Sequence, residues 1–365
     1  MDHAGGRRGA RTRGHEGIRG GVVIDGSMTC RLVADPDAEV RYLAALNVCF
    51  PGWGDRAMFD WCFAREGSWP RADLMTLHAD GHVIAGTANT YRRVRLANGQ
   101  GLTVAIMTGS WTLPEARGRG AFTRLIDESR DRAAARGAGL LLAYVACGNA
   151  SASRLRAAGA ALVPTWYCRS AVDVPSPLES PAPRAAAHPI AEGADRQQWP
   201  DNLFAPGAPA DLTQFLYTDR EWRAQFLDRP AAPVRVRDAG AHRWAALVDR
   251  ASLFDRVLAV APAHDDGACL DAISALTARA RAAGRRLFTF TTTASRAASL
   301  RERGFDLIDG WLTALVADEA ALRQARGPDP GAPASSWPPL VSGALTDRTS
   351  PWYLGDWFVQ NGDRM

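Results

Sequence analysis

The stretch that most constrains the fold is LPEARGRGAFTRLIDESRDRAAARG, residues 113–137. It passes from an apolar strand through a turn of glycine and arginine into an amphipathic run, which predicts a helix over residues 120–136. Gly137 stands where a C-cap glycine ends such a helix. The first amides of a helix have no intrahelical partner, and the helix dipole favours negative charge there. The turn therefore predicts an anion-binding site.

Length and composition limit the classes of function. The chain has 365 residues, 47% of them apolar, which is enough for two domains with sizeable cores. Its formal net charge of +4 is too small to argue for nucleic acid by itself. All 43 basic residues are arginine, a bias typical of a GC-rich genome. The lack of lysine excludes P-loop nucleotide hydrolases and Schiff-base enzymes, which need one.

The cysteines and the N-terminus indicate a cytoplasmic protein. The six cysteines lie far apart without a CxxC pair, which speaks against a zinc ribbon or a disulfide scaffold. We find no signal peptide and no apolar run that approaches the ~18 residues of a membrane span. Residues 1–27 are Gly/Arg-rich, and we expect a disordered tail. The alternative use of this tail is as a nucleic-acid-binding arm.

Apolar periodicity predicts an alternation of strands and helices before residue 175. A hairpin is predicted at Asp80–Gly81, because the flanking residues alternate and this dipeptide favours a tight turn. His78 and His82 flank the turn and would point differently on a hairpin than on a helix, so no metal site is expected. The predicted order is β-α-α-β-β-β-α-β-α-β. The strands lie at about 28–33, 72–79, 82–94, 101–114, 139–147 and 160–172, and the helices at 37–49, 57–65, 120–136 and 150–159.

The second half of the chain echoes the first. Residues 175–209 have the Pro/Ala-rich composition of a linker. Beyond it, three segments match earlier ones in the same order, which suggests an internal duplication. The pairs are 61–70 with 222–230, 134–146 with 279–293, and 153–163 with 299–308. We expect domains at 28–174 and 210–320, followed by a C-terminal extension, 321–365, that docks back through its aromatic residues.

The first domain resembles the GNAT superfamily of acyl-CoA N-acyltransferases. The family pattern Arg/Gln-x-x-Gly-x-Gly/Ala follows a strand that ends in proline, and here PEARGRGAF supplies Pro114, Arg117 and Gly120. Phe122 departs from the pattern at its last position. Downstream, CGNASASRLRAAG resembles the second motif of the family, in which Asn149 would contact the cofactor. The resemblance implies a tandem GNAT fold of mixed α/β class, in which helices flank two mixed, mostly antiparallel sheets.

The resemblance also implies a site for acyl-CoA as co-substrate. The backbone amides of residues 117–122 would hold the pyrophosphate, the end of the preceding strand would pair with pantetheine, and residues after the fifth strand would hydrogen-bond it. Asn149 has an alternative role as the N-cap of the following helix. The implied contacts are Trp111, Thr112, Leu113, Arg117, Gly118, Arg119, Gly120, Ala121, Phe122, Asn149 and Ser151.

The sequence identifies the acid and the base poorly. Many GNAT enzymes carry a tyrosine where this chain has Leu155. Asp356 is a candidate base because burial between Trp352 and Trp357 would raise the pKa of its carboxyl group. His188 is a second candidate, because it lies in the linker where a substrate cleft could form. Tyr144 and Tyr167 fit core aromatics better than acids.

The second domain does not repeat the cofactor motif. Asp265 and Asp266 stand where the arginines and glycines should fall, and they would repel a pyrophosphate. We therefore expect one acyl-CoA site and no metal. The predicted activity is acyl transfer to a primary amine of an amino sugar, an aminoglycoside or a peptide natural product, without a nucleic-acid or membrane partner. The alternative is a non-catalytic CoA-binding protein, which the leucine at position 155 supports. Acyl length, acceptor and oligomeric state stay open.

Overall fold

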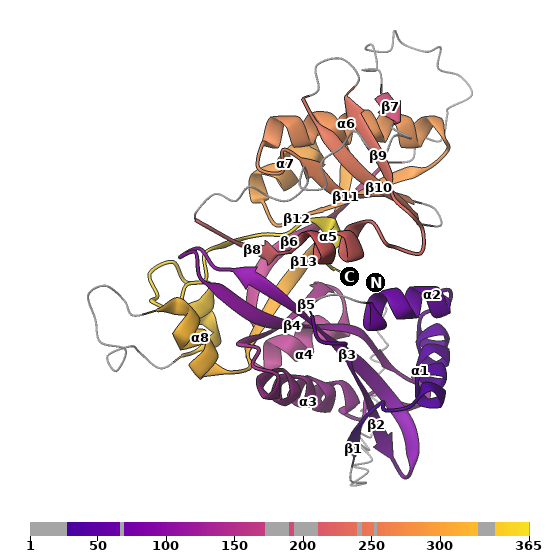
Figure 1. Ribbon diagram of the computed structural model, residues 1–365, viewed down its shortest axis with the longest axis vertical. Coiled ribbons are helices and arrows are strands. Elements are labelled where there is room, and N and C mark those ends of the chain that lie inside the picture. The colour runs from indigo at the N-terminus through magenta and orange to yellow at the C-terminus, as the bar shows by residue number, and fades with distance from the viewer. Residues whose placement is uncertain are drawn as a thin grey trace, which may run out of the picture.

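The chain folds around one large mixed sheet with helices on both sides (Figure 1). The computed structural model describes residues 28–65, 69–171, 190–192, 211–238, 243–251, 254–327 and 340–364. Among the helices in these segments, none has the length and apolar character that crossing a membrane requires.

The first half follows the predicted order of elements. Its strands are β1 (Thr29–Leu32), β2 (Asp73–Ala79), β3 (His82–Arg95), β4 (Gly101–Thr112), β5 (Leu140–Ala146) and β6 (Ala161–Ser170). Its helices are α1 (Pro36–Cys49), α2 (Arg56–Phe59) with the π-helical turn Asp60–Ala64, α3 (Ala121–Ala135) and α4 (Ala150–Ala157). The predicted hairpin joins β2 to β3, with Asp80 and Gly81 at φ 51° and 79°. The order β-α-α-β-β-β-α-β-α-β is confirmed.

The second half repeats this order from its first helix onward. Its elements are β7 (Ile190–Glu192), β8 (Leu212–Leu216), α5 (Asp219–Phe226), β9 (Val234–Asp238), β10 (Ala245–Ala251), β11 (Phe254–Ala261), α6 (Asp266–Ala282), β12 (Arg286–Thr291), α7 (Ala294–Glu302) and β13 (Phe305–Val316). As in the first half, three antiparallel strands precede a parallel pair, which here is β11 and β12. The two halves are therefore structural repeats.

The repeats exchange their last strands. The sheet order is β1-β2-β3-β4-β5-β13-β6-β12-β11-β10-β9-β7. Strand β13 of the second repeat lies between β5 and β6 of the first, and β6 pairs in turn with β12. Each repeat thus completes the sheet of the other, and this central contact holds the two halves in one structure.

The C-terminal segment packs along the junction between the repeats. It contains α8 (Glu319–Arg326), the 3-10 turn Ser342–Leu345, β14 (Asp356–Phe358) and the 3-10 turn Asn361–Arg364. Strand β14 pairs with β8, which in turn pairs with β3. Trp352 and Trp357 are buried. The domain limits drawn from the sequence stay a prediction, since most of the linker over 175–209 lies outside the described residues.

Candidate functional site

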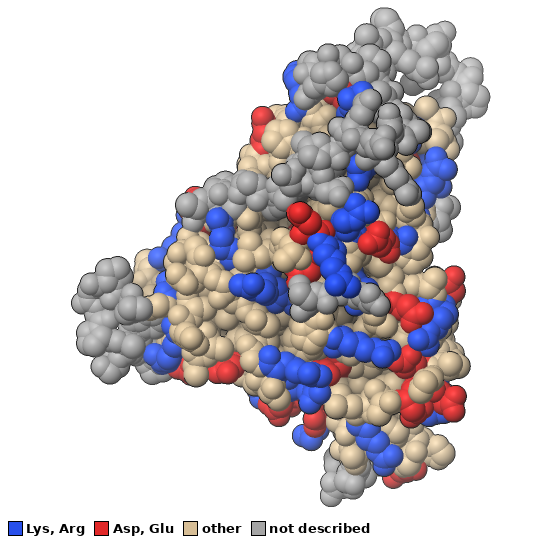
Figure 2. Space-filling model, viewed as in Figure 1, with Lys and Arg blue, Asp and Glu red and all other residues tan. Residues whose placement is uncertain are grey.

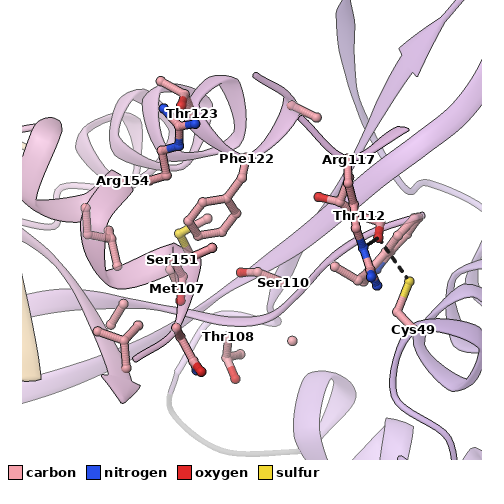
Figure 3. Close-up of a pocket in the computed structure, with 18 of the residues that line it drawn as sticks. Cys49, Met107, Thr108, Ser110, Thr112, Arg117, Phe122, Thr123, Ser151 and Arg154 are labelled. Carbon is pink, nitrogen blue, oxygen red and sulfur yellow. Dashed lines mark hydrogen bonds between the residues drawn. The ribbon is translucent and has the colours of Figure 1, made fainter. Parts of the chain in front are cut away.

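The candidate site is a gap between two parallel strands of the first repeat. Strands β4 and β5 pair only over Val104–Ile106 and Leu140–Leu142. Beyond these residues they diverge, which leaves the edge of β4 from Met107 onward without a strand partner on that side. A β-bulge in the β3–β4 ladder near Gly109 bends this part of β4. The gap opens into a cavity of about 900 Å³ (Figure 3).

The turn at the mouth of the cavity has the geometry of an anion-binding site. Gly118 and Gly120 adopt φ of 80° and 81°, and a Cβ at either position would meet nothing within 4 Å. Gly120 is also the N-cap of α3 and supplies no side-chain cap. The amides that begin α3 therefore face open space that a ligand can approach closely. The helix dipole adds positive potential at the same place.

The backbone groups at the end of the strand before this turn point alternately to β3 and to the opposite edge of β4. The Leu113 amide donates to the Ile84 carbonyl, at 2.9 Å, so it is engaged with β3, and Leu113 does not line the cavity. Because strand residues alternate, Thr112 turns its backbone groups to the opposite edge. Arg117 Nε and Cys49 Sγ both donate to the Thr112 carbonyl, at 3.4 and 3.5 Å (Figure 3).

Most of the predicted contact residues line this one cavity. From the turn these are Arg117, Gly118, Gly120, Ala121 and Phe122, whereas Arg119 is exposed and lies outside the lining. Trp111 and Thr112 line it from β4. The Phe122 ring extends into the cavity toward Met107 and Ser151 (Figure 3). The structure thus brings together residues that the sequence placed on separate elements.

Residues at the start of α4 form the opposite wall. Asn149 is the N-cap of α4, as its alternative role predicts, but its side chain makes no capping hydrogen bond. Its exposed amide is therefore available to a ligand. Ser151 and Arg154 lie on the same wall. The sequence did not single out Arg154, although its place three residues after Ser151 on the predicted helix, on the same face, could have indicated it.

Tyr144 was expected in the core and lies partly in the cavity. It packs edge-on against Phe290, with ring centroids 5.9 Å apart, and also lines the gap. Its hydroxyl is buried and has no hydrogen-bond partner within the described segments of the chain. Burial raises the pKa of Tyr144 well above its usual value, so the hydroxyl stays protonated and acts as a donor. Leu155 is buried in the same lining and brings no polar group.

The inner end of the cavity is closed by a residue that the sequence analysis missed. Arg364 lies in the lining, 220 positions along the chain from Tyr144. Neighbouring Asp363 is buried, where its carboxylate accepts hydrogen bonds from the Tyr217 hydroxyl at 2.7 Å and from the Gln360 amide at 2.6 Å. No local pattern signals this placement, because the docking of the C-terminal segment creates it.

The two residues proposed as a base lie elsewhere. The expected burial of Asp356 is wrong, since its side chain is 60% exposed and pairs with Arg348 at 2.6 Å. Asp356 is the exposed first residue of β14, ahead of the buried Trp357 and Phe358, and its carboxylate also accepts from the Tyr353 hydroxyl at 2.5 Å. Asp356 lines a different cavity, of about 550 Å³, beside α6 and α7. His188 lies outside the described residues.

The lining of the candidate site contains three arginines and neither a carboxylate nor an imidazole among the residues that the structure describes. In that same part of the chain, no group of three or more His, Cys, Asp or Glu is placed to hold a metal ion. On the surface shown in Figure 2, arginines and acidic side chains are interspersed. The charged side chains of the lining are therefore all cationic, while Glu115 acts on Cys49 and Asp363 acts on Tyr144 from outside the lining.

Comparison of the sequence with protein-family models and with curated proteins gives no match. Solved structures do share the fold. A GCN5-related N-acetyltransferase from Anabaena variabilis aligns at TM-score 0.55 and 12% identity, over 81% of this chain and 75% of that chain. N-myristoyltransferase from Saccharomyces cerevisiae, with bound myristoyl-CoA, aligns at TM-score 0.55 and 10% identity, over 79% and 80%.

These likenesses define the class of fold. The chain has the fold of the GCN5-related N-acetyltransferases, with the strand gap and the glycine turn described above. A tandem GNAT protein from the clavulanic acid biosynthesis pathway aligns at TM-score 0.53 and 16% identity, over 80% of this chain and 99% of that chain. The chain is thus a tandem GNAT fold, and the fold class expected from the sequence is confirmed.

Proposed function

We propose that this protein is an acyl-CoA-dependent N-acyltransferase with one cofactor site, in the first repeat. The observation that carries the proposal is the gap between β4 and β5 with the Gly118–Gly120 turn at its mouth. An elongated ligand with a phosphate group at one end fits this arrangement. Phosphate suits the free amides of α3, and a polar chain suits the unpaired edge of β4.

Different residues of the gap bind different parts of acyl-CoA. The Arg117 amide is engaged with the Pro114 carbonyl at 3.3 Å, so the amides from Gly118 to Phe122 hold the pyrophosphate. Trp111 pairs with Gly86 of β3, so the backbone of Thr112 is the part of β4 that pairs with pantetheine. Asn149 and Ser151 bind pantetheine from the opposite wall. A backbone amide of β4 beside the thioester carbonyl stabilises the oxyanion that forms when an amine attacks.

The acceptor is inferred from the composition and from the structural neighbours, since the lining of the cavity does not specify it. We infer a primary amine of a small or medium-sized molecule, such as an amino sugar, an aminoglycoside or a peptide natural product. A role in specialised metabolism agrees with the GC-rich composition and with the tandem structural neighbour from clavulanic acid biosynthesis. A cytoplasmic location belongs to the same proposal, and all six cysteines are free thiols.

A non-catalytic acyl-CoA-binding protein is the second candidate. Leu155 favours it, because that position of the fold commonly carries a tyrosine acid and here is buried and apolar. Both candidates predict binding of acyl-CoA. Only the enzyme predicts that a bound acyl group leaves for an amine.

The test combines binding with transfer. Thermal unfolding is measured with CoA and with acetyl-, octanoyl- and palmitoyl-CoA, and the stabilising donor is then incubated with a panel of amines. At 100 times its Kd, a ligand stabilises by about 2.7 kcal/mol. We expect one donor class to stabilise the protein and mass spectrometry to detect an acylated amine. Stabilisation without product favours the second candidate, and no shift with any CoA species contradicts the proposal. The lack of lysine keeps self-acylation to the N-terminal amine and the cysteines.

A further inference from the structure

The cavity of the first repeat reaches through the sheet. Ala143 and Val145 on β5 face the core that includes α3 and α4, whereas Leu142 and Tyr144 face the other side. Residues with both orientations line the cavity. The mouth at Gly118 and Gly120 therefore continues to an inner end on the opposite face of the sheet, where Arg364 lies.

The guanidinium of Arg364 is held by neutral groups. It lies 4.3 Å from the ring centroid of Tyr167 and 4.4 Å from that of Phe290. Its Nη1 donates to the Asn361 side chain at 3.1 Å, and the Tyr167 hydroxyl is a further neutral partner. None of the described residues is a hydrogen-bond partner of the buried Nε. Within the part of the chain that the structure describes, no carboxylate forms an ion pair with Arg364.

The nearest carboxylate along the chain is already engaged. Asp363 accepts hydrogen bonds from Tyr217 and Gln360, and Arg92 is the arginine whose charge acts on it. A buried cation without a counter-ion is unfavourable, because it loses its hydration and gains no paired charge. Burial accordingly lowers the pKa of Arg364. A ligand that brings a negative charge would relieve this cost.

Two unused donors meet at the inner end. Besides Arg364 Nε, the buried hydroxyl of Tyr144 has no partner among the residues that the structure describes, and both residues line the cavity. The Arg364 Cζ lies 5.8 Å from the centroid of the Tyr144 ring, so the two side chains are neighbours in this lining. A carboxylate accepts several hydrogen bonds at once and pairs strongly with arginine.

We propose that Arg364 and Tyr144 bind a carboxylate that one of the two reactants carries at the end of the cavity where the acyl group is transferred. This inference rests on the proposed function and deepens it. The carboxylate belongs either to the acyl group, as in a dicarboxylic acyl-CoA, or to the acceptor, as in an amino acid. If the carboxylate belongs to the acceptor, the polycationic aminoglycosides drop out of the proposed acceptor classes, since Arg364 would repel them.

The first arm of the experiment tests the acyl group. Titration calorimetry compares succinyl-CoA with butyryl-CoA, which has the same chain length without the charge. The second arm tests the acceptor. With CoA saturating, glycine, L-glutamate and L-phenylalanine are each compared with the amide of their α-carboxylate. A charge-assisted hydrogen bond predicts that the carboxylate form binds at least about tenfold tighter in one of the arms.

Two substitutions assign the preference to this residue. Arg364→Gln should abolish the preference for the carboxylate. Arg364→Lys should retain part of it, because the ammonium keeps the positive charge but lacks the paired N–H donors of the guanidinium. Arg154→Gln is the matched control. It removes another cavity arginine, on the wall of α4, and should leave the ratio between the two ligand forms unchanged.

The result that overturns the proposal is equal binding of the charged and uncharged forms in both arms. A preference that survives in Arg364→Gln also overturns it. If Arg364→Gln does not fold, the comparison in the wild type and the Arg364→Lys variant decide. The affinity for CoA itself is measured in the same titrations, so failure of the cofactor site is recorded separately from failure of this inference.

Discussion

Both repeats have a gap between two parallel strands, but the gap is open in the first repeat and filled in the second. In the second repeat, β11 and β12 pair only over Phe254–Arg256 and Arg286–Phe288, as β4 and β5 do over three residues. The gap beyond them is filled by the C-terminal segment of the chain. Asn361 Nδ2 donates to the Val257 carbonyl at 2.9 Å. The cavity that remains measures about 30 Å³, against about 900 Å³ in the first repeat.

The N-termini of the equivalent helices α3 and α6 also differ: the first is open and the second is capped by the protein itself. Gly120 leaves the first amides of α3 free, whereas Asp265 caps α6 by accepting from the Ala268 amide at 2.9 Å. Asp266 follows it and pairs with Arg296 at 2.7 Å. Two carboxylates therefore occupy the positive end of the helix that a phosphate would need. The comparison teaches that a few residues decide whether the gap stays open or is filled by the protein's own chain.

The largest expected effect comes from a buried carboxyl group in the segment that fills the second gap. Burial raises the pKa of Asp363 from 3.8 to about 7. Because folding raises this pKa, the protonated Asp363 contributes its full stabilisation of the folded state below pH 3.8, the pKa of the unfolded state. This contribution is lost as pH rises through the folded-state pKa of about 7. A shift of about three units corresponds to up to about 4 kcal/mol. Asp363→Asn should remove this loss between pH 4 and pH 8.

Urea unfolding at both pH values measures the change for wild type and variant. Asp356→Asn is the control, since its side chain is 60% exposed on the same segment and its ion pair contributes little. We expect the control to follow the wild-type profile. Parallel profiles for wild type and Asp363→Asn would show that this carboxyl group does not titrate between the two pH values.

A smaller effect is expected from crowding the same segment. A Cβ on Gly362 would overlap the ring of Phe226, which is fully buried. Gly362→Ala should therefore reduce the free energy of unfolding by about 1–3 kcal/mol. Gly343→Ala is the matched control, because a Cβ there meets nothing within 4 Å. Loosening the segment should not create a second CoA site, because Asp265 and Asp266 remain. Equal stability of the two variants would contradict the packing described here.

Local patterns predicted the parts of the site that depend on neighbouring residues. Strand alternation, the Asp80–Gly81 turn and the glycines before α3 each act within a few positions, and the structure has them where expected. The N-cap position of Asn149 was predictable for the same reason. Trp111 and Thr112 followed from the end of a strand next to the turn.

Features that depend on long-range packing could not be predicted in this way. The exchange of β6 and β13 joins strands from different repeats, and nothing in either strand specifies its partner. Arg364 reaches the cavity only because the C-terminal segment fills the second gap. Asp356 was expected to be buried between tryptophans, but it begins the short strand β14 at the surface, where it pairs with Arg348. The Leu113 amide donates to the Ile84 carbonyl, and this hydrogen bond depends on the register between β3 and β4.

The most direct test of the account is the number of CoA molecules that one chain binds. Isothermal titration of wild type, Gly120→Glu and Gly137→Glu compares two exposed glycines at opposite ends of α3, with φ of 81° and 72°. Both substitutions strain the backbone alike, but only Gly120→Glu places a carboxylate at the proposed phosphate site. We predict one CoA per chain for wild type and Gly137→Glu, and affinity at least about 100-fold weaker for Gly120→Glu. Two molecules per chain, or unchanged affinity in Gly120→Glu, would contradict a single site in the first repeat.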